Sequence, residues 1–518
     1  MIDLLEFLPK LAWLIPLLPL LAAAGIALRI LGGWDKGDLA EPPSARIAIY
    51  CVGMALLLLL ALDGMAFTGG APGQVRSGVW LSSGDIVLPI SFTLDALALS
   101  IATLVAFIAT IVLVFSRSYL HREVGFHRFF LGMSLFVSGM LLIVLAGNVV
   151  LTFVGWELAG VSSWMLIGYA YERTTATANA LRAIVTNRFG DAGFILGIAL
   201  ALIWLGSVEW PDLLRAHQLG TLSAGLLALG FVVAALAKSA QAPFSPWIAR
   251  ALEGPTPSSA IFYGALMVHA GVYLLVRMEP LLRQAPALMS LIAALGLLTA
   301  LYGYFSGLTQ TDVKSALMFA TTTQVGLMFL ACGLGWFTLA AWHLGLHAGW
   351  RAYQFLASPS YMHLIGGAPT RVAPAWLRNR QRLYTAALQR FWLEALGDWL
   401  LVRPTQQMAR DVRNLDDNVV SRLVGLPESA GVPAFLSASG EEMNKNQVVR
   451  GSGLAGALLE WSALKLHHFE ARLLFQSGDS RLNRMLTRIG AYLLAAEGLL
   501  SQPRYLLLLI MATLVVIL

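Results

Sequence analysis

Charged residues are scarce in this sequence. Asp, Glu, Lys and Arg make up only 12% of its 518 residues, whereas 58% are hydrophobic, and the mean hydropathy is +0.71. A soluble domain typically carries about 25% charged residues. The composition therefore excludes a soluble enzyme and predicts a polytopic membrane protein.

Cysteine is almost absent as well. Cys51 and Cys332 lie in separate apolar segments, which excludes a disulfide framework and a cysteine-rich metal site. No flavin, quinone or iron–sulfur motif is found in the sequence, so we expect neither a cofactor nor a metal in this chain. Asp3 and Glu6 precede the first apolar run, which is unlike a cleaved secretory signal.

Apolar runs long enough to cross a bilayer, about 17–25 residues each, follow one another along most of the chain. They lie near 11–31, 46–67, 94–116, 128–146, 148–170, 183–205, 222–242, 258–277, 288–305, 313–333 and 337–357. Between the second and third runs, two short strand-like pieces, Val79–Leu81 and Ile86–Phe92, predict a small hairpin on one membrane surface.

Lysine and arginine alternate between the loops in a way that predicts the orientation. The loops after the first, third and fifth runs are rich in them, whereas 68–93 holds only Arg76. The basic residues of the richer loops and their edges are Arg29, Lys36, Arg46, Arg117, Arg122, Arg128, Arg173 and Arg182. Because cytoplasmic loops carry the excess of positive charge, we expect a multi-pass protein of a bacterial inner membrane with its N-terminus on the periplasmic side.

The character of the sequence changes after residue 360. Residues 383–426 and 454–500 read as amphipathic helix, a polar linker (427–448) separates them, and 503–518 is a short apolar end that is either the last part of a span or a span cut by the end of the chain. On the first of these helices, four large apolar side chains share one face: Trp392, Leu396, Trp399 and Leu400. We expect a cytoplasmic or interfacial helical segment; a docking arm for a partner subunit is the functional alternative.

Two apolar runs each hold one isolated charge, Glu157 in the fifth and Lys238 in the seventh. A charge at the bilayer centre costs roughly 2.5–3.5 kcal/mol, so such a residue usually faces a partner or a water path. Lysine titrates readily when buried, and Pro243 and Pro246 interrupt the helix just after Lys238. We interpret the pair as a proton site. The structural alternatives are a glutamate bonded to a neighbouring helix and a lysine that extends to the membrane surface.

Further polar side chains within apolar runs extend this prediction. Arg188 and Asp191 are three residues apart and share a helix face, so they either polarise Glu157 or form a structural ion pair. Tyr263 and His269 either link Lys238 to later histidines or are ordinary hydrogen-bonded core residues.

A stripe of three residues occurs in the last long run. His343, His347 and Arg351 are spaced by four and therefore lie on one side of a helix. Histidine changes its charge near neutral pH, which favours a proton relay. A histidine in the membrane is also found as a hydrogen-bonded core residue, and metal binding lacks a third ligand nearby.

Several long motifs resemble one family. They are GWELAGVSSWMLIGYAYER, NRFGDAGF, AKSAQAPFSPW, ALEGPTPSSA, MVHAGVYLLVR and QTDVKSALMFATTTQVGLMFLA. Over about residues 80–357 the chain resembles the antiporter-like L subunit of bacterial respiratory complex I, whose superfamily includes the large subunit of multisubunit cation/proton antiporters.

The resemblance implies an all-α membrane fold of about 11–12 transmembrane helices. It implies two inverted five-helix repeats with broken helices, and a polar axis along the middle of the membrane. In that axis Glu157 and Lys238 would form the first half-channel and Asp191 would tune it. Lys314 and the pair His343 and His347 would continue the axis.

The sequence departs from the family pattern at three places. The family histidine on the eighth span is Tyr263, and the family lysine after the two histidines is Arg351. After residue 360 the sequence runs almost directly into LGDWLLVRPTQQMARDV, which resembles the family's C-terminal segment. By this resemblance the second repeat is expected to lack at least two spans, together with the central lysine of the family's second half-channel. The expected divisions are 1–127 (N-terminal spans and hairpin), 128–277 (first repeat), 288–360 (partial second repeat), 361–502 (helical arm) and 503–518 (apolar segment).

These features predict a subunit that lies in membrane lipid and moves H⁺ or Na⁺, coupling the ion gradient to at least one partner protein. Some proteins of the superfamily that this chain resembles pair with a carbonic-anhydrase-like soluble subunit in energy-coupled inorganic-carbon uptake, and the resemblance implies that process as a role. The alternatives are a proton-pumping L-type subunit of a complex I-like NADH–quinone oxidoreductase and a non-conducting structural anchor. No catalytic chemistry is expected in this chain alone.

Overall fold

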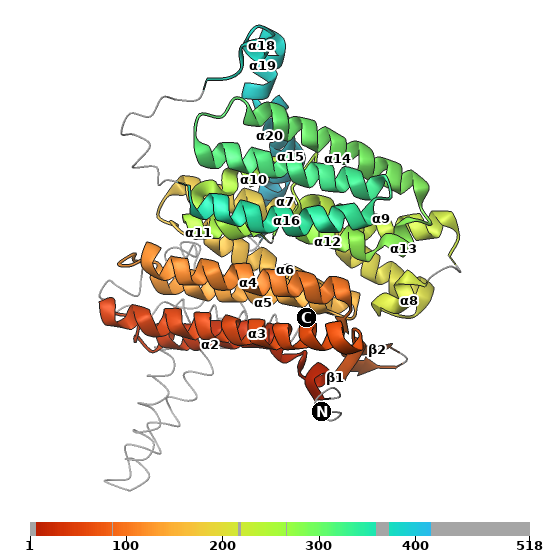
Figure 1. The fold of residues 1–518 in the computed structure, drawn as a ribbon. Helices are drawn as coiled ribbons and strands as arrows, with labels where there is room; N and C mark the ends of the chain where they lie inside the picture. Colours follow the sequence, from red (N-terminus) through yellow and green to blue (C-terminus); the bar gives the residue numbers. More distant parts are fainter. Residues whose placement is uncertain (1–6, 85, 216–218, 266, 359–371, 416–518) are drawn as a thin grey trace, which may run out of the picture. The chain divides into compact units, whose positions relative to one another are not determined.

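The computed structural model describes residues 7–84, 86–215, 219–265, 267–358 and 372–415 (Figure 1). Its contacts divide the chain into two compact units, Met1–Val402 and Arg403–Leu518. The described part of the second unit is one helix, α21 (Arg403–Leu415). The first unit holds all the predicted site residues.

Helices form nearly all of the first unit, which confirms the all-α polytopic class. Among the described residues, nine helices are long and apolar enough to cross a membrane. They include α2 (Leu14–Leu31), α3 (Glu41–Gly69), α4 (Ala96–Tyr119), α5 (Phe126–Leu145), α6 (Val149–Ile167), α7 (Thr174–Leu205), α9 (Thr221–Lys238), α14 (Pro286–Gly307) and α15 (Val313–Gly333).

The two other predicted spans are also helical. The run 337–357 forms α16 (Phe337–Leu356), whose histidines and arginine make it more polar than the nine. The run 258–277 is divided into α11 (Thr256–Ser259), a π-helical turn η4 (Ala260–Ala265) and α12 (Ala270–Arg277).

A second interruption follows α9, as the prolines predict. The helix ends at Lys238, and the chain continues irregularly to α10 (Pro246–Arg250). The break therefore places the end of a helix next to the lysine, where the indole of Trp247 donates to the carbonyl of Ala237 at 2.9 Å. The shorter elements are η1 (Leu8–Leu11), η2 (Asp38–Ala40), α8 (Trp210–Leu214), η3 (Ala251–Glu253), α13 (Glu279–Leu282), α18 (Ala375–Arg378), α19 (Gln381–Leu388), η5 (Arg390–Trp392), α20 (Leu393–Gly397) and η6 (Asp398–Val402).

The predicted hairpin is present and longer than expected. Strands β1 (Gly73–Ser83) and β2 (Ile86–Leu94) pair antiparallel. The backbone N–H of Gly147 donates to the carbonyl of Ser91 at 2.7 Å, so the hairpin lies against the start of α6. We call this end of the helices the hairpin side, and the end that carries Arg117, Arg122, Arg128, Arg173 and Arg182 the arginine side.

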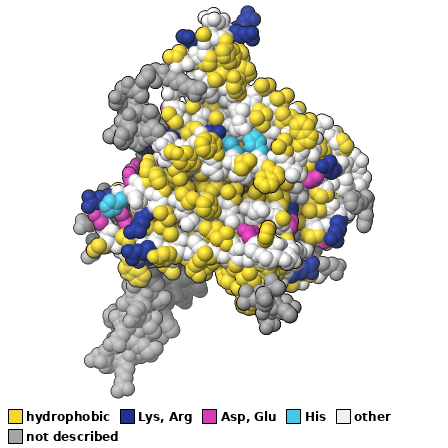
Figure 2. All heavy atoms as spheres, viewed as in Figure 1, with side chains coloured by type: hydrophobic (Ala, Val, Ile, Leu, Met, Phe, Trp, Pro, Cys, Tyr) yellow, Lys and Arg dark blue, Asp and Glu magenta, His cyan; other side chains and the backbone are white. Residues whose placement is uncertain are grey.

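Charge follows these two sides. Figure 2 shows Lys, Arg, Asp and Glu side chains mainly toward the helix ends, with hydrophobic side chains between them and a small group of histidines within the apolar field. Such a belt is what a bilayer requires, because its core cannot solvate charge.

Glycine brings α5 and α6 into close contact. A Cβ added to Gly139 would lie 2.7 Å from the backbone nitrogen of Ala159 and 2.8 Å from the carbonyl oxygen of Gly155. Membrane helices associate through such small residues because lipid provides no hydrophobic driving force between them. This contact sets the position of α6, which carries Glu157.

The segment after residue 372 differs from the continuous amphipathic helix predicted over 383–426. Positive φ values at Arg390, Phe391 and Trp392 interrupt it. Residues 372–402 belong to the first compact unit, which ends at Val402. Arg182 of α7 binds Asp398 with two hydrogen bonds of 2.8 and 2.7 Å, which attaches this segment to the helices. The predictions for 427–448, 454–500 and 503–518 lie outside the described residues.

Candidate ion-translocation site

Glu157 lies near the middle of the 19-residue helix α6 and is bound by an arginine. Nη1 of Arg188, on the neighbouring helix α7, forms an ion pair with Oε2 of Glu157 and lies 3.6 Å from Oδ2 of Asp191. The predicted shared face of Arg188 and Asp191 is therefore confirmed. Arg188 bridges the two carboxylates.

Glu157 and Lys238, interpreted from the sequence as one proton site, are bound by different partners. Among the described residues no ion pair within 4 Å joins them. The reason is geometric. The long side chain of Arg188 occupies the position beside Glu157, while Nζ of Lys238 turns toward the backbone of α6, where the carbonyl oxygen of Trp156 accepts its hydrogen bond at 3.2 Å.

Lys238 is buried, with 1% of its surface exposed. Its Nζ also lies 5.1 Å from the centre of the Trp156 ring, and a Cβ on Gly160 would be only 3.2 Å from it. Its place at the C-terminal end of α9 favours a positive charge, because the helix dipole is negative there.

Trp156 connects this lysine to the acidic residues. Its indole Nε1 donates to Oδ1 of Asp191 at 3.1 Å, while its carbonyl binds Lys238. Sequence reasoning missed this role, because a tryptophan beside a glutamate in an apolar run has no distinguishing pattern. The site is thus a connected group of two carboxylates, one arginine and one lysine around a buried indole ring.

A second group lies on α16 and α12. Nε2 of His269 and Nδ1 of His347 are 3.0 Å apart, and Nε2 of His343 is 2.9 Å from Oε1 of Gln324. The predicted stripe on α16 and the predicted approach of His269 to it are both present. Nε and Nη2 of Arg351 both donate to Nε2 of His347 at 3.4 Å.

The break after α9 lies between these two groups. Ser239, Gln241 and Ser245 in this segment are all buried. The backbone of α12 packs closely on it, because a Cβ on Gly271 would be 2.3 Å from Oγ of Ser239. A route for protons requires polar groups at membrane depth, and the broken segment supplies them beside Lys238.

Two family models match the chain. One, described as "NADH:quinone oxidoreductase/Mrp antiporter, TM", matches residues 146–401, and one described as "NADH-Ubiquinone oxidoreductase (complex I), chain 5 N-terminus" matches 80–130. The chain belongs to the superfamily of complex I and Mrp antiporter membrane subunits.

Individual relatives agree with this assignment. The NAD(P)H-quinone oxidoreductase chain 5 of Synechocystis sp. is 36% identical over 371 residues, 70% of this chain and 54% of the relative. The chloroplastic subunit 5 of Marchantia polymorpha is 35% identical over 371 residues, 69% of this chain and 53% of the relative. The chain spans little more than half the length of these curated relatives.

The fold is also known from a solved structure. The Mrp complex from Dietzia sp. contains a chain that superposes with a TM-score of 0.57 at 22% identity, covering 97% of this chain and 62% of that one. At this identity the likeness shows the fold alone.

Two other predicted site residues, Tyr263 and Lys314, lie apart from the group around Lys238. The hydroxyl of Tyr263 donates to the carbonyl of Ile248 at 3.2 Å, and its ring centre is 5.6 Å from that of Phe355. Among the described residues, no hydrogen bond joins Tyr263 to Lys238 or to a histidine. Lys314 lies at the arginine side, where its Nζ donates to Oγ1 of Thr256 at 2.5 Å.

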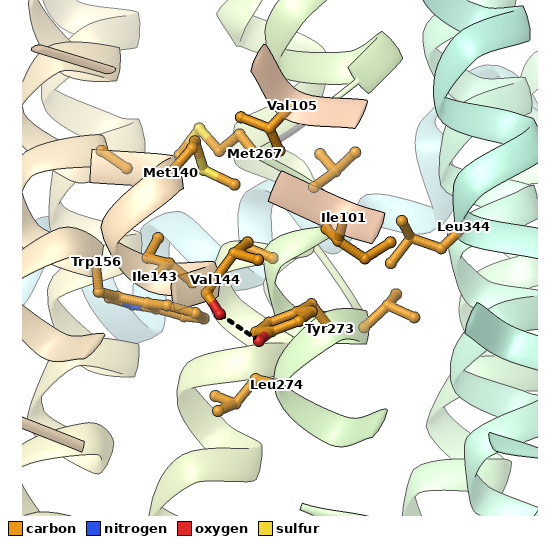
Figure 3. Packing of buried hydrophobic residues seen from close by; sticks show 14 of the residues in the cluster. Ile101, Val105, Met140, Ile143, Val144, Trp156, Met267, Tyr273, Leu274 and Leu344 are labelled. Carbon is orange, nitrogen blue, oxygen red and sulfur yellow. Dashed lines mark hydrogen bonds between the residues drawn. The ribbon is translucent and has the colours of Figure 1, made fainter. Parts of the chain in front are cut away.

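An apolar layer closes the histidine group toward the hairpin side. Figure 3 shows Tyr273 of α12 between Trp156 and Leu344, with its hydroxyl donating to the carbonyl of Val144, at 2.6 Å. The cavity that Tyr273, Leu344 and His269 line with their neighbours has a volume of about 10 Å³. That is about the minimum volume that holds one water molecule. His269 is therefore separated from the hairpin side by packed side chains.

Proposed function

We propose that this protein is a proton-translocating membrane subunit of a multisubunit complex of the complex I and Mrp type. The observation that carries the proposal is the buried Lys238, held through Trp156 to Asp191 and, beyond it, to Arg188 and Glu157. Ionisable side chains at membrane depth are costly, and they mark ion pathways. Lysine and histidine exchange protons and are poor ligands for Na⁺, which prefers oxygen atoms, so we choose the proton over Na⁺.

The geometry supports a sequence of two stations. A proton taken up by the group around Glu157 passes to Lys238, and the polar break after α9 leads on toward His269, His347 and His343. Arg188 contacts both carboxylates. Its movement toward one and away from the other changes which carboxylate is charged, because an opposite charge favours the ionised form.

The exposure of Arg188 supports a partner within the membrane. Its side chain is 51% exposed, although it binds Glu157 near the middle of a span. A guanidinium at this depth does not face lipid without a large cost. The same helix exposes Phe189, Ile195 and Leu196. We therefore expect another membrane subunit to cover this face of α7 and to offer Arg188 a polar or acidic group.

The relatives support a proposal about the kind of complex. Their names describe subunits of NAD(P)H-quinone oxidoreductases and an Mrp complex, which favours a complex I-like assembly over inorganic-carbon uptake. Proteins that co-purify with the tagged full chain decide between them. Flavin and iron–sulfur subunits support the first, whereas a lone carbonic-anhydrase-like subunit supports the second.

The orientation proposed from the loops fits the fold. The arginine side faces the cytoplasm by the positive-inside rule, and the hairpin side faces the periplasm of a bacterial inner membrane. η1 precedes α2 and lies near β1, so the N-terminal end of the described chain is on the hairpin side (Figure 1).

Substitution of the two central residues tests the function. Glu157→Gln and Lys238→Ala are each expected to abolish proton transport by the complex in membrane vesicles, while the complex still assembles. Glu172→Gln, which changes an exposed loop carboxylate, is the control and keeps the wild-type rate. Transport at the wild-type rate in both site variants would instead indicate a non-conducting anchor.

A further inference from the structure

A buried carboxylate lies on the hairpin side, outside the groups described above. Glu209 follows α7 and has 5% of its surface exposed. Its Oε2 accepts hydrogen bonds from Gln74 of β1 and from Oγ of Ser91 in β2, the latter at 3.1 Å. Its Oε1 has no hydrogen-bond partner among the described residues, and Nη2 of Arg76 is 3.9 Å away. Burying an oxygen of a carboxylate without a partner is costly.

Glu209 lines a cavity between the hairpin and the end of α7. The cavity has a volume of about 540 Å³. Its other lining residues include Arg76, Val79, Pro89, Ser207 and Asp212. The charged groups that face Glu209 here are Arg76 from β1 and Asp212 from α8. Through this cavity the otherwise enclosed carboxylate of Glu209 is accessible from the hairpin side.

An oriented chain of hydrogen bonds connects Glu209 to α6. Nε1 of Trp210 donates to Oγ1 of Thr152 at 3.1 Å, and that hydroxyl donates to the carbonyl of Asn148 at 2.8 Å. Nδ2 of Asn148 donates to Oγ of Ser91 at 3.0 Å, and Ser91 donates to Glu209. The last two donors, Nδ2 of Asn148 and Oγ of Ser91, act in succession toward Glu209, so they stabilise a negative charge there, and consecutive hydrogen bonds reinforce one another.

The same helix leads from this chain to the lysine site. Asn148, Thr152 and Trp156 are spaced by four on α6 and therefore share one side of it. Between Trp210 and Trp156 the space is filled by Phe231 and Phe194, with ring centres 6.1, 5.0 and 5.4 Å apart in succession. These aromatic rings separate Glu209 from Asp191, so the two carboxylates are distinct stations on one side of α6.

We propose that Glu209 is the proton-exchange residue at the hairpin-side mouth of the path to Lys238. The inference rests on the proposed function. The surroundings favour a proton over a metal cation, because Gln74, Ser91 and Arg76 present hydrogen-bond donors, whereas a cation requires several oxygen ligands. The aromatic rings of Phe194 and Phe231 form the barrier that a proton crosses only when α6 and α7 rearrange.

The electrostatics of Glu209 agree with this role. Burial raises the pKa of Glu209 above its ordinary value, and the hydrogen bond from Ser91, the charge of Arg76 and the hydrogen bond from Gln74 offset part of that effect. A carboxylate with a raised pKa releases and accepts a proton closer to neutral pH than an ordinary glutamate does.

The test uses the full-chain complex in vesicles, with the pH set separately on each side. Glu209→Gln retains the shape of the side chain but carries no exchangeable acid. We expect the rate to fall by about tenfold or more and to lose its dependence on the pH of the hairpin side. Glu279→Gln, which changes a carboxylate paired with Arg283 outside the cavity, keeps the wild-type rate and profile.

A second variant keeps the test decisive if Glu209→Gln does not assemble. Ser91→Ala removes one donor to the carboxylate and is expected to move the hairpin-side pH profile upward by roughly half a unit or more. A purely structural Glu209 would leave that profile unmoved.

The inference is overturned if Glu209→Gln assembles with the wild-type rate and profile, or if Ser91→Ala leaves the profile unchanged. If Glu157→Gln still abolishes transport in that case, only this inference fails. If Glu157→Gln also has no effect, the proposed function fails with it.

Discussion

Arg351 donates two hydrogen bonds to the same nitrogen of His347, Nε2, at 3.4 Å each. Because arginine has no acceptor, Nε2 must accept, and a neutral His347 then carries its hydrogen on Nδ1. That hydrogen points to Nε2 of His269, 3.0 Å away. Arg351 therefore selects one tautomer of His347 and, as a neighbouring positive charge, disfavours its protonation.

Substitution of Arg351 tests this relationship through the pH profile of transport. Arg351→Lys retains a positive donor and is expected to keep the wild-type profile. Arg351→Gln removes the charge, so His347 holds a proton more readily and transport falls at acidic pH. The measurement is the rate of proton movement in vesicles from pH 5 to 8, the range in which histidine titrates.

Two results would contradict this account of Arg351. The first is an Arg351→Gln variant with a wild-type profile. The second is a clear increase of the transport rate in Arg351→Lys. Such an increase would mean that Arg351 blocks the proton path, as expected if the protein is a non-conducting structural anchor.

The close contact of α5 and α6 predicts a large effect of one methyl group. Gly139→Ala places a Cβ 2.7 Å from the backbone nitrogen of Ala159, so the helices must separate. We expect a destabilisation of about 1–3 kcal/mol, typical of overpacking. Gly345→Ala on α16, where a Cβ meets nothing within 4 Å, is the control.

Thermal unfolding of the purified complex in detergent measures this effect. A Gly139→Ala variant as stable as the control would show that the contact between α5 and α6 does not limit stability.

Much of the fold could be predicted from the sequence. Long apolar runs must be helical in lipid, because every backbone polar group needs a partner within its own segment. Within the described residues each of the eleven runs forms mainly helix, and Pro243 marks the break after α9. Contacts within one helix followed from spacing alone, as for Arg188 with Asp191 and His347 with Arg351.

Contacts between helices could not be predicted in the same way. Whether Glu157 meets Arg188 or Lys238 depends on the rotation of α6 and α7 about their axes, which apolar sequences do not encode locally. Glu209 lies in a short connection without periodicity, and its partners Gln74 and Ser91 are more than one hundred residues away. The helix interruption at Phe391 could not be predicted either, because no glycine or proline occurs at that position.

The raised pKa of Glu209 predicts how stability depends on pH. The unfolded chain has the ordinary glutamate pKa of about 4.3, and burial raises the pKa in the folded protein. As the pH rises above the pKa of the unfolded chain, the unfolded state releases its proton first. The contribution of Glu209 to the free energy of unfolding therefore falls until the pH exceeds the pKa of the folded protein, and above that pH it is constant.

Glu209→Gln should remove this component. The measurement is the melting temperature of the wild-type and variant complexes from pH 4.5 to 8. The difference between the two melting temperatures should change with pH, because only the wild type loses stability as the pH rises. Parallel curves over the whole range would contradict the assignment.

The central claim is that Lys238 gives up and regains a proton during transport. Arginine keeps a positive charge at this position but cannot lose its proton at any accessible pH. The most direct measurement is therefore the initial rate of proton movement by the assembled Lys238→Arg complex in vesicles under an imposed proton gradient. The account predicts a rate no higher than that of Lys238→Ala, whereas transport by Lys238→Arg at the wild-type rate would contradict it.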